Sequence, residues 1–146
     1  MAQMTANLKF KKLNGRATAP TRERDSDAGI DLYAATRAKL AAGNREAVST
    51  GYAVAIPDGY YGQIEERSGF SMRNTLKLKA GVIDSEYRGE IKIVFQNAGA
   101  YPEEIAAGEK IAQLIIHRQP KVTFEFVEEL DDTNRGEKGF GSSDKK

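Results

Sequence analysis

The chain has 146 residues, enough for one domain that buries a core without disulfides, and it contains no Cys. Its 22 Lys and Arg residues nearly balance 21 Asp and Glu residues, which argues against a surface built for a nucleic-acid backbone. The single histidine, His117, excludes His-based triads and multi-His metal sites, so any metal would be held by oxygen, which indicates magnesium. No apolar run approaches the roughly 18 residues of a membrane span, and no signal-peptide pattern is present. We therefore expect a soluble protein of the cytoplasm.

The first part of the chain predicts two strands with a polar loop between them. Residues 7–13 alternate apolar and polar side chains, and residues 14–27 carry many charges and a proline. Residues 27–35 predict the next strand, with apolar side chains on one face and Asp31 on the other. An acid in such a strand is costly to bury unless it is paired or lies at a site. Asp31 is therefore either a solvent-facing acid or a site residue.

A β-hairpin is predicted over residues 48–65. A turn containing Gly43 precedes it, and the strand over 46–56 ends at the turn tripeptide of residues 57–59 (PDG). Proline fixes φ there, and glycine permits the positive φ that the turn requires. Residues 60–65 then form the returning strand.

Residues 66–74 (ERSGFSMRN) predict a short helix with Ser68 as its N-cap. The backbone N–H groups at such a helix start, together with Arg67 and the Ser68 hydroxyl, would form a ready anion site. A capped turn with a surface arginine fits the same residues. The segment alone does not decide between the two.

A second predicted hairpin, over residues 81–93, combines an acid and an aromatic residue. Residues 81–83 end one strand, and residues 84–89 form the turn region. In such a hairpin Asp84 and Tyr87 lie close together at one mouth, where a small molecule could rest between carboxylate and ring. An ordinary turn acid beside a tyrosine packed on a sheet face is the alternative.

The following residues predict two more strands, over 90–96 and 110–116, separated by a turn at 97–99 and a loop over 101–108. Gln113 interrupts the second strand. A buried-looking amide is either satisfied by neighbouring backbone or directed at a ligand. Many short strands, no internal repeat and no long helical periodicity favour an all-β fold.

Residues 121–126 predict a last strand whose buried face carries Val122, Phe124 and Phe126. The tail that follows, residues 131–146, has a single large apolar residue, Phe140, and cannot bury enough surface to order itself. We therefore expect a domain over residues 1–130 and a flexible C-terminal arm over 131–146. The arm is either a solvated terminus or a lid that lays Phe140 on a planar ring and Arg135 on a phosphate.

Five segments, in order, resemble one family, the trimeric dUTP pyrophosphatases (dUTPases). They are residues 28–32 (AGIDL), 67–71 (RSGFS), 81–89 (GVIDSEYRG), 108–114 (GEKIAQL) and 135–143 (RGEKGFGSS). The resemblance implies a jelly-roll-like β-barrel with one short helix and a flexible C-terminal tail. It also implies a homotrimer whose sites are shared between subunits, with no direct nucleic-acid partner and no membrane.

The resemblance implies hydrolysis of dUTP to dUMP and pyrophosphate, which limits uracil incorporation into DNA and supplies dUMP for thymidylate synthesis. Asp84 would orient and deprotonate the water that attacks the α-phosphorus. Arg135 would contact the terminal phosphates. Mg²⁺ would gather the three phosphates, with Asp31 acting near it through water.

Substrate recognition is implied residue by residue as well. Tyr87 would stack under the deoxyribose and leave no room for a 2′-hydroxyl, and Phe140 would cover the uracil ring. Main-chain groups of Gly81, Val82 and Ile83 would read the uracil edge. The other substrate-binding residues that the resemblance implies are Arg67, Ser68, Gly69, Gln113, Arg135, Gly141 and Ser142.

One departure from the family lies beside the phosphate-binding residues. Glu66 stands where many relatives carry a small residue, and its carboxylate either pairs with Arg73 or points to solvent. Two other functions remain as alternatives. One is a dCTP deaminase-type enzyme of the same fold, and the other is a nucleotide-gated interaction protein.

Overall fold

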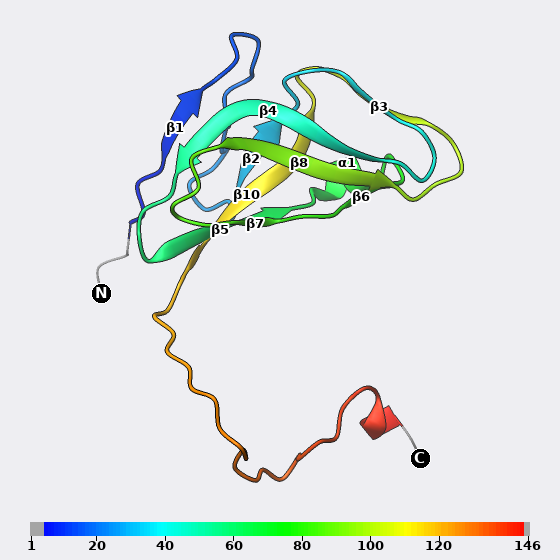
Figure 1. Ribbon diagram of the computed structural model, residues 1–146. Helices are drawn as coiled ribbons and strands as arrows, with labels where there is room; N and C mark the ends of the chain where they lie inside the picture. Colours follow the sequence, from blue (N-terminus) through cyan, green and yellow to red (C-terminus); the bar gives the residue numbers. More distant parts are fainter. Residues whose placement is uncertain (1–4, 145–146) are drawn as a thin grey trace.

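The computed structural model describes residues 5–144, and within them the chain forms ten short strands and one short helix (Figure 1). The helix is α1 (Ser68–Ser71), and a 3₁₀ turn, η1, covers Ser142–Asp144. The strands are β1 (Lys9–Lys12), β2 (Gly29–Tyr33), β3 (Ala38–Leu40), β4 (Arg45–Ala55), β5 (Tyr60–Glu65), β6 (Leu76–Leu78), β7 (Val82–Ile83), β8 (Glu90–Asn97), β9 (Glu103–Ile105) and β10 (Lys110–Arg118). The all-β prediction is confirmed.

Two four-stranded sheets enclose the core. Their strand orders are β1-β4-β8-β6 and β2-β10-β5-β7, and β3 pairs with β9 in a small third sheet. Alternation along β8 buries Ile91, Ile93 and Phe95 while Lys92 stays exposed. These side chains join Leu114 and other residues of the second sheet in one hydrophobic cluster. Burial of each large apolar side chain contributes about 1.5–3 kcal/mol, so this shared cluster holds the two sheets together.

Neither predicted hairpin forms, because each predicted pair of strands is divided between the two sheets. β4 pairs with β1 and β8, whereas β5 pairs with β10 and β7. β8 likewise pairs with β4 and β6, not with β7. The turn at residues 57–59 is present, with the Tyr60 N–H donating to the Pro57 carbonyl (3.3 Å), but it carries the chain from one sheet to the other. Turn residues specify a reversal of the chain, whereas the pairing partner depends on contacts distant in sequence.

Three short strands were not predicted, and one of them, β6, lies between the predicted helix and the second predicted hairpin. The segment over 38–43 contains the expected turn at Gly43 but also β3, and the predicted loop over 101–108 contains β9. Each of these strands has three residues. Such a length is too short for an alternating pattern to be recognised.

The predicted last strand over 121–126 is wrong for the single chain. β10 ends at Arg118, and residues 119–144 form no strand and extend away from both sheets (Figure 1). The side chains of Val122, Phe124 and Phe126 are 72%, 81% and 94% exposed. Apolar alternation makes a segment suited to a sheet but supplies no partner edge. The division at residue 130 and the flexibility of the arm stay predictions, and residues 145–146 lie outside the described part of the chain.

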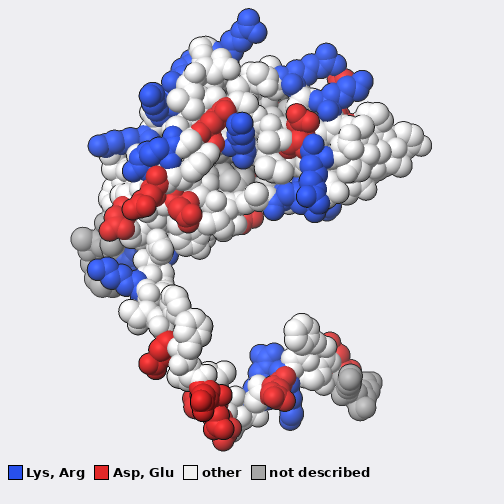
Figure 2. Space-filling model, in the orientation of Figure 1, with Lys and Arg blue, Asp and Glu red and all other residues white. Residues whose placement is uncertain are grey.

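Charged side chains cover the sheets without separating by sign in the view of Figure 2, where basic and acidic groups are interspersed. Within residues 5–144, no helix combines the length and apolar character needed to cross a bilayer.

An irregular stretch of β4, between Ser49 and Ala53, bends the strand where it pairs with β8. Gly51 lies in this stretch with a φ of +71°, which glycine adopts at little cost. A Cβ at Gly51 would lie 2.5 Å from the Cβ of Ala17. Both the backbone angle and the close approach therefore require glycine here.

We expect Gly51→Ala to lower the free energy of unfolding by about 3 kcal/mol, about 1 from the positive φ and the rest from the clash. Gly43→Ala is the matched control, since Gly43 has a φ of +80° but open space around its Cα. It should cost only about 1 kcal/mol. Chemical denaturation measures the free energy of unfolding of both variants. Equal losses of that free energy in Gly51→Ala and Gly43→Ala would contradict the proposed clash with Ala17.

Candidate active site

The segment Arg67, Ser68 and Gly69, named the phosphate arm, follows β5 and forms the start of α1. Arg67 is the N-cap residue, with extended backbone (φ −104°, ψ 134°) and no side-chain capping bond. The prediction of Ser68 as N-cap is therefore wrong, because Ser68 is the first residue inside the single helical turn. Phe70 is buried next to Phe95, with ring centroids 5.5 Å apart, and fixes the arm to the core. Ser68 and Gly69 are left exposed.

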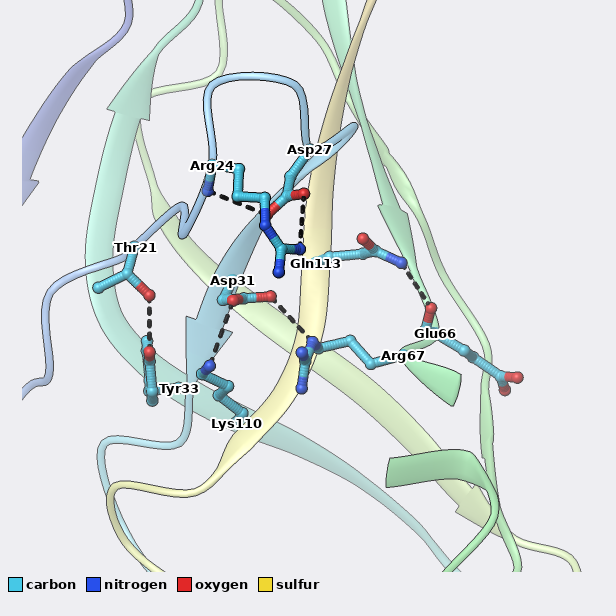
Figure 3. Close-up of polar contacts among 9 residues, drawn as sticks. All are labelled: Thr21, Arg24, Asp27, Asp31, Tyr33, Glu66, Arg67, Lys110 and Gln113. Atoms are coloured by element: carbon cyan, nitrogen blue, oxygen red, sulfur yellow. Dashed lines mark hydrogen bonds and ion pairs between the residues drawn. The ribbon is translucent and has the colours of Figure 1, made fainter. Parts of the chain in front are cut away.

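Asp31 lies beside the phosphate arm and is paired with two cations. Its Oδ1 accepts a hydrogen bond from Arg67 Nε (2.8 Å), and its Oδ2 lies 3.5 Å from Lys110 Nζ (Figure 3). The Asp31 side chain is only 14% exposed, and a carboxylate at that burial is costly without such partners. Asp31 is therefore a paired acid at a polar hollow, not a solvent-facing one.

Lys110 is a site residue that the sequence alone does not single out. It stands at the start of β10, opposite Tyr33 of β2, and its ammonium also lies 6.0 Å from the centroid of the Tyr33 ring. Only the pairing of β10 with β2 brings it to Asp31. The one available signal was its place in a segment that resembles the family.

Gln113 connects two of the segments that the sequence placed apart. Its Nε2 donates to the main-chain oxygen of Glu66 (2.9 Å), the residue before the phosphate arm (Figure 3). Its side chain lies against Gly29 of β2, where a Cβ would fall 2.1 Å from the Gln113 Oε1. The main-chain oxygen of Glu66 thus satisfies the amide nitrogen of Gln113. The residue also lines the same hollow as Asp31 and Arg67.

Glu66 does not pair with Arg73; its side chain is exposed, and its carboxylate accepts two hydrogen bonds. Its Oε1 accepts the Leu78 N–H (3.1 Å) and its Oε2 accepts the Ser71 hydroxyl (3.3 Å). Arg73 instead lies 3.8 Å from Glu109. Figure 3 shows the Glu66 carboxylate directed away from Asp31 and Arg67. This carboxylate therefore ties α1 to β6 and does not face Asp31.

A second hollow lies where the chain passes from β7 to β8. Its lining includes Asp84 and Tyr87, as well as Gly81, Val82 and Ile83. The Tyr87 N–H donates to the Asp84 carbonyl (3.1 Å), and this turn brings the two side chains to one opening. Asp84 and Tyr87 are both exposed. The structure thus places them together, although they link two sheets and not the two strands of a hairpin.

The remaining expected site residues lie elsewhere in the chain. Arg135 donates from Nε to the Lys138 carbonyl (2.7 Å), and Phe140 is fully exposed with a φ of +52°. Gly141 and Ser142 belong to the same terminal turns, which lie apart from the strands of both sheets (Figure 1). The two hollows have no lining residue in common. A single chain therefore holds the expected site in three separate parts.

The fold and the site together define a class: a jelly-roll-like β protein with a polar arm suited to an anion and a separate carboxylate–tyrosine hollow. The family model for dUTPase matches residues 15–144. The chain belongs to the dUTPase family.

Relatives in bacteria, viruses and mammals carry the name deoxyuridine 5′-triphosphate nucleotidohydrolase. The protein of Corynebacterium glutamicum is 45% identical over 143 residues, 96% of each chain. The protein of Swinepox virus is 44% identical and covers 96% of this chain and 99% of its own. The protein of Mus musculus is 40% identical and covers 99% of this chain and 89% of its own.

Solved structures of phage dUTPases are similar over nearly the whole fold. The Staphylococcus bacteriophage 80alpha dUTPase with dUPNHPP has a TM-score of 0.88 at 32% identity, covering 94% of this chain and 98% of the phage chain. The dUTPase of S. aureus phage phi11, in a mutant described for its coordination of a structural Mg(II) ion, has a TM-score of 0.80 at 27% identity. It covers 86% of this chain and 99% of that one.

We expect Glu66→Ala to weaken binding of a non-hydrolysable dUTP analogue about fivefold, because loss of one net hydrogen bond of about 1 kcal/mol releases the phosphate arm. Binding of dUMP, which lacks the outer phosphates, should change less than twofold. Glu66→Gln keeps an oxygen acceptor for the Leu78 N–H and should stay close to the wild type. Calorimetric titration measures all three, and equal weakening of both ligands by Glu66→Ala would contradict a role confined to the arm.

Proposed function

We propose that this protein is a dUTP nucleotidohydrolase, which releases dUMP and pyrophosphate by attack of water on the α-phosphorus. The observation that carries the proposal is the hollow in which the Asp84 carboxylate and the Tyr87 ring stand beside β7. Membership in the dUTPase family supports the same reaction. We keep the cytoplasm as the proposed location.

Asp84 is the proposed general base. An exposed carboxylate can hold a water molecule by a hydrogen bond and accept its proton as the oxygen attacks phosphorus. Attack on the α-phosphorus breaks its bond to the bridging oxygen, so dUMP keeps the new oxygen and pyrophosphate leaves. The chain's contribution is to place the base and to hold the phosphates for this in-line displacement.

β7 is the proposed reader of the base. It is the last strand of its sheet, so β5 pairs with one side of Val82 and Ile83 and their other side is free. The N–H and C=O groups of a free strand edge can pair with a ligand as they would with another strand. Uracil presents an N3–H donor and an O4 acceptor to this edge, whereas cytosine presents an N3 acceptor and an amino donor, so the edge would favour uracil. Tyr87 beside it would exclude a 2′-hydroxyl.

Arg67, Ser68, Gly69 and Gln113 are the proposed phosphate ligands. Among residues 5–144 no group of three or more His, Cys, Asp or Glu side chains could hold a metal ion. Mg²⁺ commonly binds through one or two carboxylates and substrate phosphates, which fits Asp31 acting through water. When bound with the triphosphate, the ion would neutralise phosphate charge and fix one conformation of the chain.

We propose a homotrimer in which neighbouring copies complete each site. The separation of the two hollows supports this, because a hollow of one copy can meet the phosphate arm of another. The extended segment with exposed Phe124 and Phe126 supports it too, since these side chains need a surface outside the single chain. The arm beyond it would bring Arg135 and Phe140 over a neighbour's site.

Asp84→Asn should lower turnover of dUTP by about 10²–10⁴-fold while dUTP affinity stays within a few-fold, because the amide cannot accept the proton of the attacking water. Glu86→Gln is the matched control, an exposed acid in the same turn, and should leave turnover unchanged. Pyrophosphate release and titration with a non-hydrolysable analogue supply the two measurements. Undiminished turnover by Asp84→Asn would refute the base assignment.

Truncation after Leu130 should leave a folded trimer whose kcat/KM for dUTP is about a hundredfold lower, because the phosphates lose their lid. Circular dichroism measures whether the truncated chain folds, light scattering whether it forms a trimer, and pyrophosphate release its kcat/KM. Arg135→Ala in the full chain should lower activity in the same direction. If the truncated chain failed to fold, the arm would be structural and the lid idea wrong.

A further inference from the structure

Glu90 is a half-buried acid at the edge of the Asp84–Tyr87 hollow that the proposed reaction does not use. It is the first residue of β8, and its Oε2 accepts two hydrogen bonds from β4. One comes from the Ser49 hydroxyl and the other from the Gly51 N–H (2.9 Å). Hydrogen bonds to a carboxylate are about twice as strong as those between neutral groups, so this is a firm attachment between the two strands.

The attachment lies at the irregular stretch of β4. The register between β4 and β8 shifts between Ser49 and Ala53, so the ladder does not supply the usual acceptor for the Gly51 N–H. The Glu90 carboxylate takes that place, and the Thr50 hydroxyl donates to the Ile91 carbonyl (2.6 Å) beside it. A buried N–H without an acceptor would be costly. Glu90 therefore sets where β8 begins relative to β4.

The main chain of the same residue holds the Tyr87 ring. The Tyr87 hydroxyl donates to the Glu90 carbonyl (2.8 Å). The ring lies across Gly89, where a Cβ would fall 2.4 Å from the hydroxyl oxygen and 2.6 Å from Cζ. The ring thus lies over a residue without a side chain and is held at its hydroxyl by the carbonyl of Glu90, although Tyr87 is 45% exposed.

We propose that Glu90 is a positioning residue which, through its attachment to Ser49 and Gly51, fixes the Tyr87 ring and so sets the selectivity for deoxyribose over ribose. The proposal rests on the proposed dUTP hydrolysis. Glu90 acts through Tyr87, whose hydroxyl donates a hydrogen bond to the Glu90 carbonyl. If the attachment is lost, the start of β8 shifts, the Tyr87 ring moves with it, and space opens for a 2′-hydroxyl.

The test compares kcat/KM for dUTP and UTP in variants of the full chain. Glu90→Ala should lower the dUTP/UTP ratio about tenfold, since sub-ångström to ångström displacements of a positioning group carry effects of this size. Glu90→Gln keeps an amide oxygen that can accept both bonds and should restore most of the selectivity. An unchanged ratio in Glu90→Ala, with only a lower melting temperature, would overturn the proposal.

Two further variants separate this role from a general loss of structure. Ser49→Ala removes one of the two bonds far from the substrate and should lower the ratio about threefold. If Glu90→Ala does not fold, this variant decides, and an unchanged ratio overturns the proposal. In a Tyr87→Ala background, adding Ser49→Ala should change the ratio no further, because the ring through which it acts is gone. A further threefold drop in the dUTP/UTP ratio in that background would show that Ser49 does not act through the Tyr87 ring and would overturn the proposal.

The wild-type protein is measured first, because its result separates the two claims. No turnover of dUTP would refute the proposed function and this inference with it. Selective turnover of dUTP with undiminished selectivity in Glu90→Ala and Ser49→Ala would refute the inference alone.

Discussion

The passage of residues 84–89 from one sheet to the other is the constraint on which the rest of the site depends. β7 belongs to the sheet of β5, whereas β8 belongs to the sheet of β4, so this short segment must cross the edge of the sandwich. The crossing leaves one side of β7 unpaired and turns the Asp84 and Tyr87 side chains toward the hollow beside it. A true hairpin would have paired that strand edge with β8 and left no free backbone for the base recognition that we propose.

The other half of the site is organised by charge. Asp31, only 14% exposed, would be costly to bury alone, but Arg67 and Lys110 pair with it, so the acid also fixes the direction of the arginine that we expect to meet phosphate. Gln113 and Glu66 then hold the arm's backbone and the helix that follows it. Each half is thus held by its own scaffold, which suits a site assembled from different copies of the chain.

Local patterns predicted much of this structure and failed where partners are distant in sequence. Alternation identified β8 correctly, and the spacing of Asp84 and Tyr87 placed both at one opening. Sheet membership could not be predicted, because the turn at residues 57–59 is compatible with a hairpin and with a crossing. The exposed segment at 121–126 failed for a related reason: its pattern predicts a strand, but no edge lies beside it within the described chain. Lys110 and the hydrogen-bond partners of Glu66 needed the folded contacts to be recognised.

The most direct test of the account is a parallel measurement of pyrophosphate and ammonia release from dUTP, UTP, dCTP and dTTP with magnesium. The account predicts rapid pyrophosphate release from dUTP but not from dCTP or UTP, since we propose that the free edge of β7 rejects cytosine and that the Tyr87 ring rejects the ribose. Ammonia from dCTP would contradict it and favour a deaminase of the same fold. Binding of dUTP with no turnover of any nucleotide would contradict it in favour of a nucleotide-gated interaction protein.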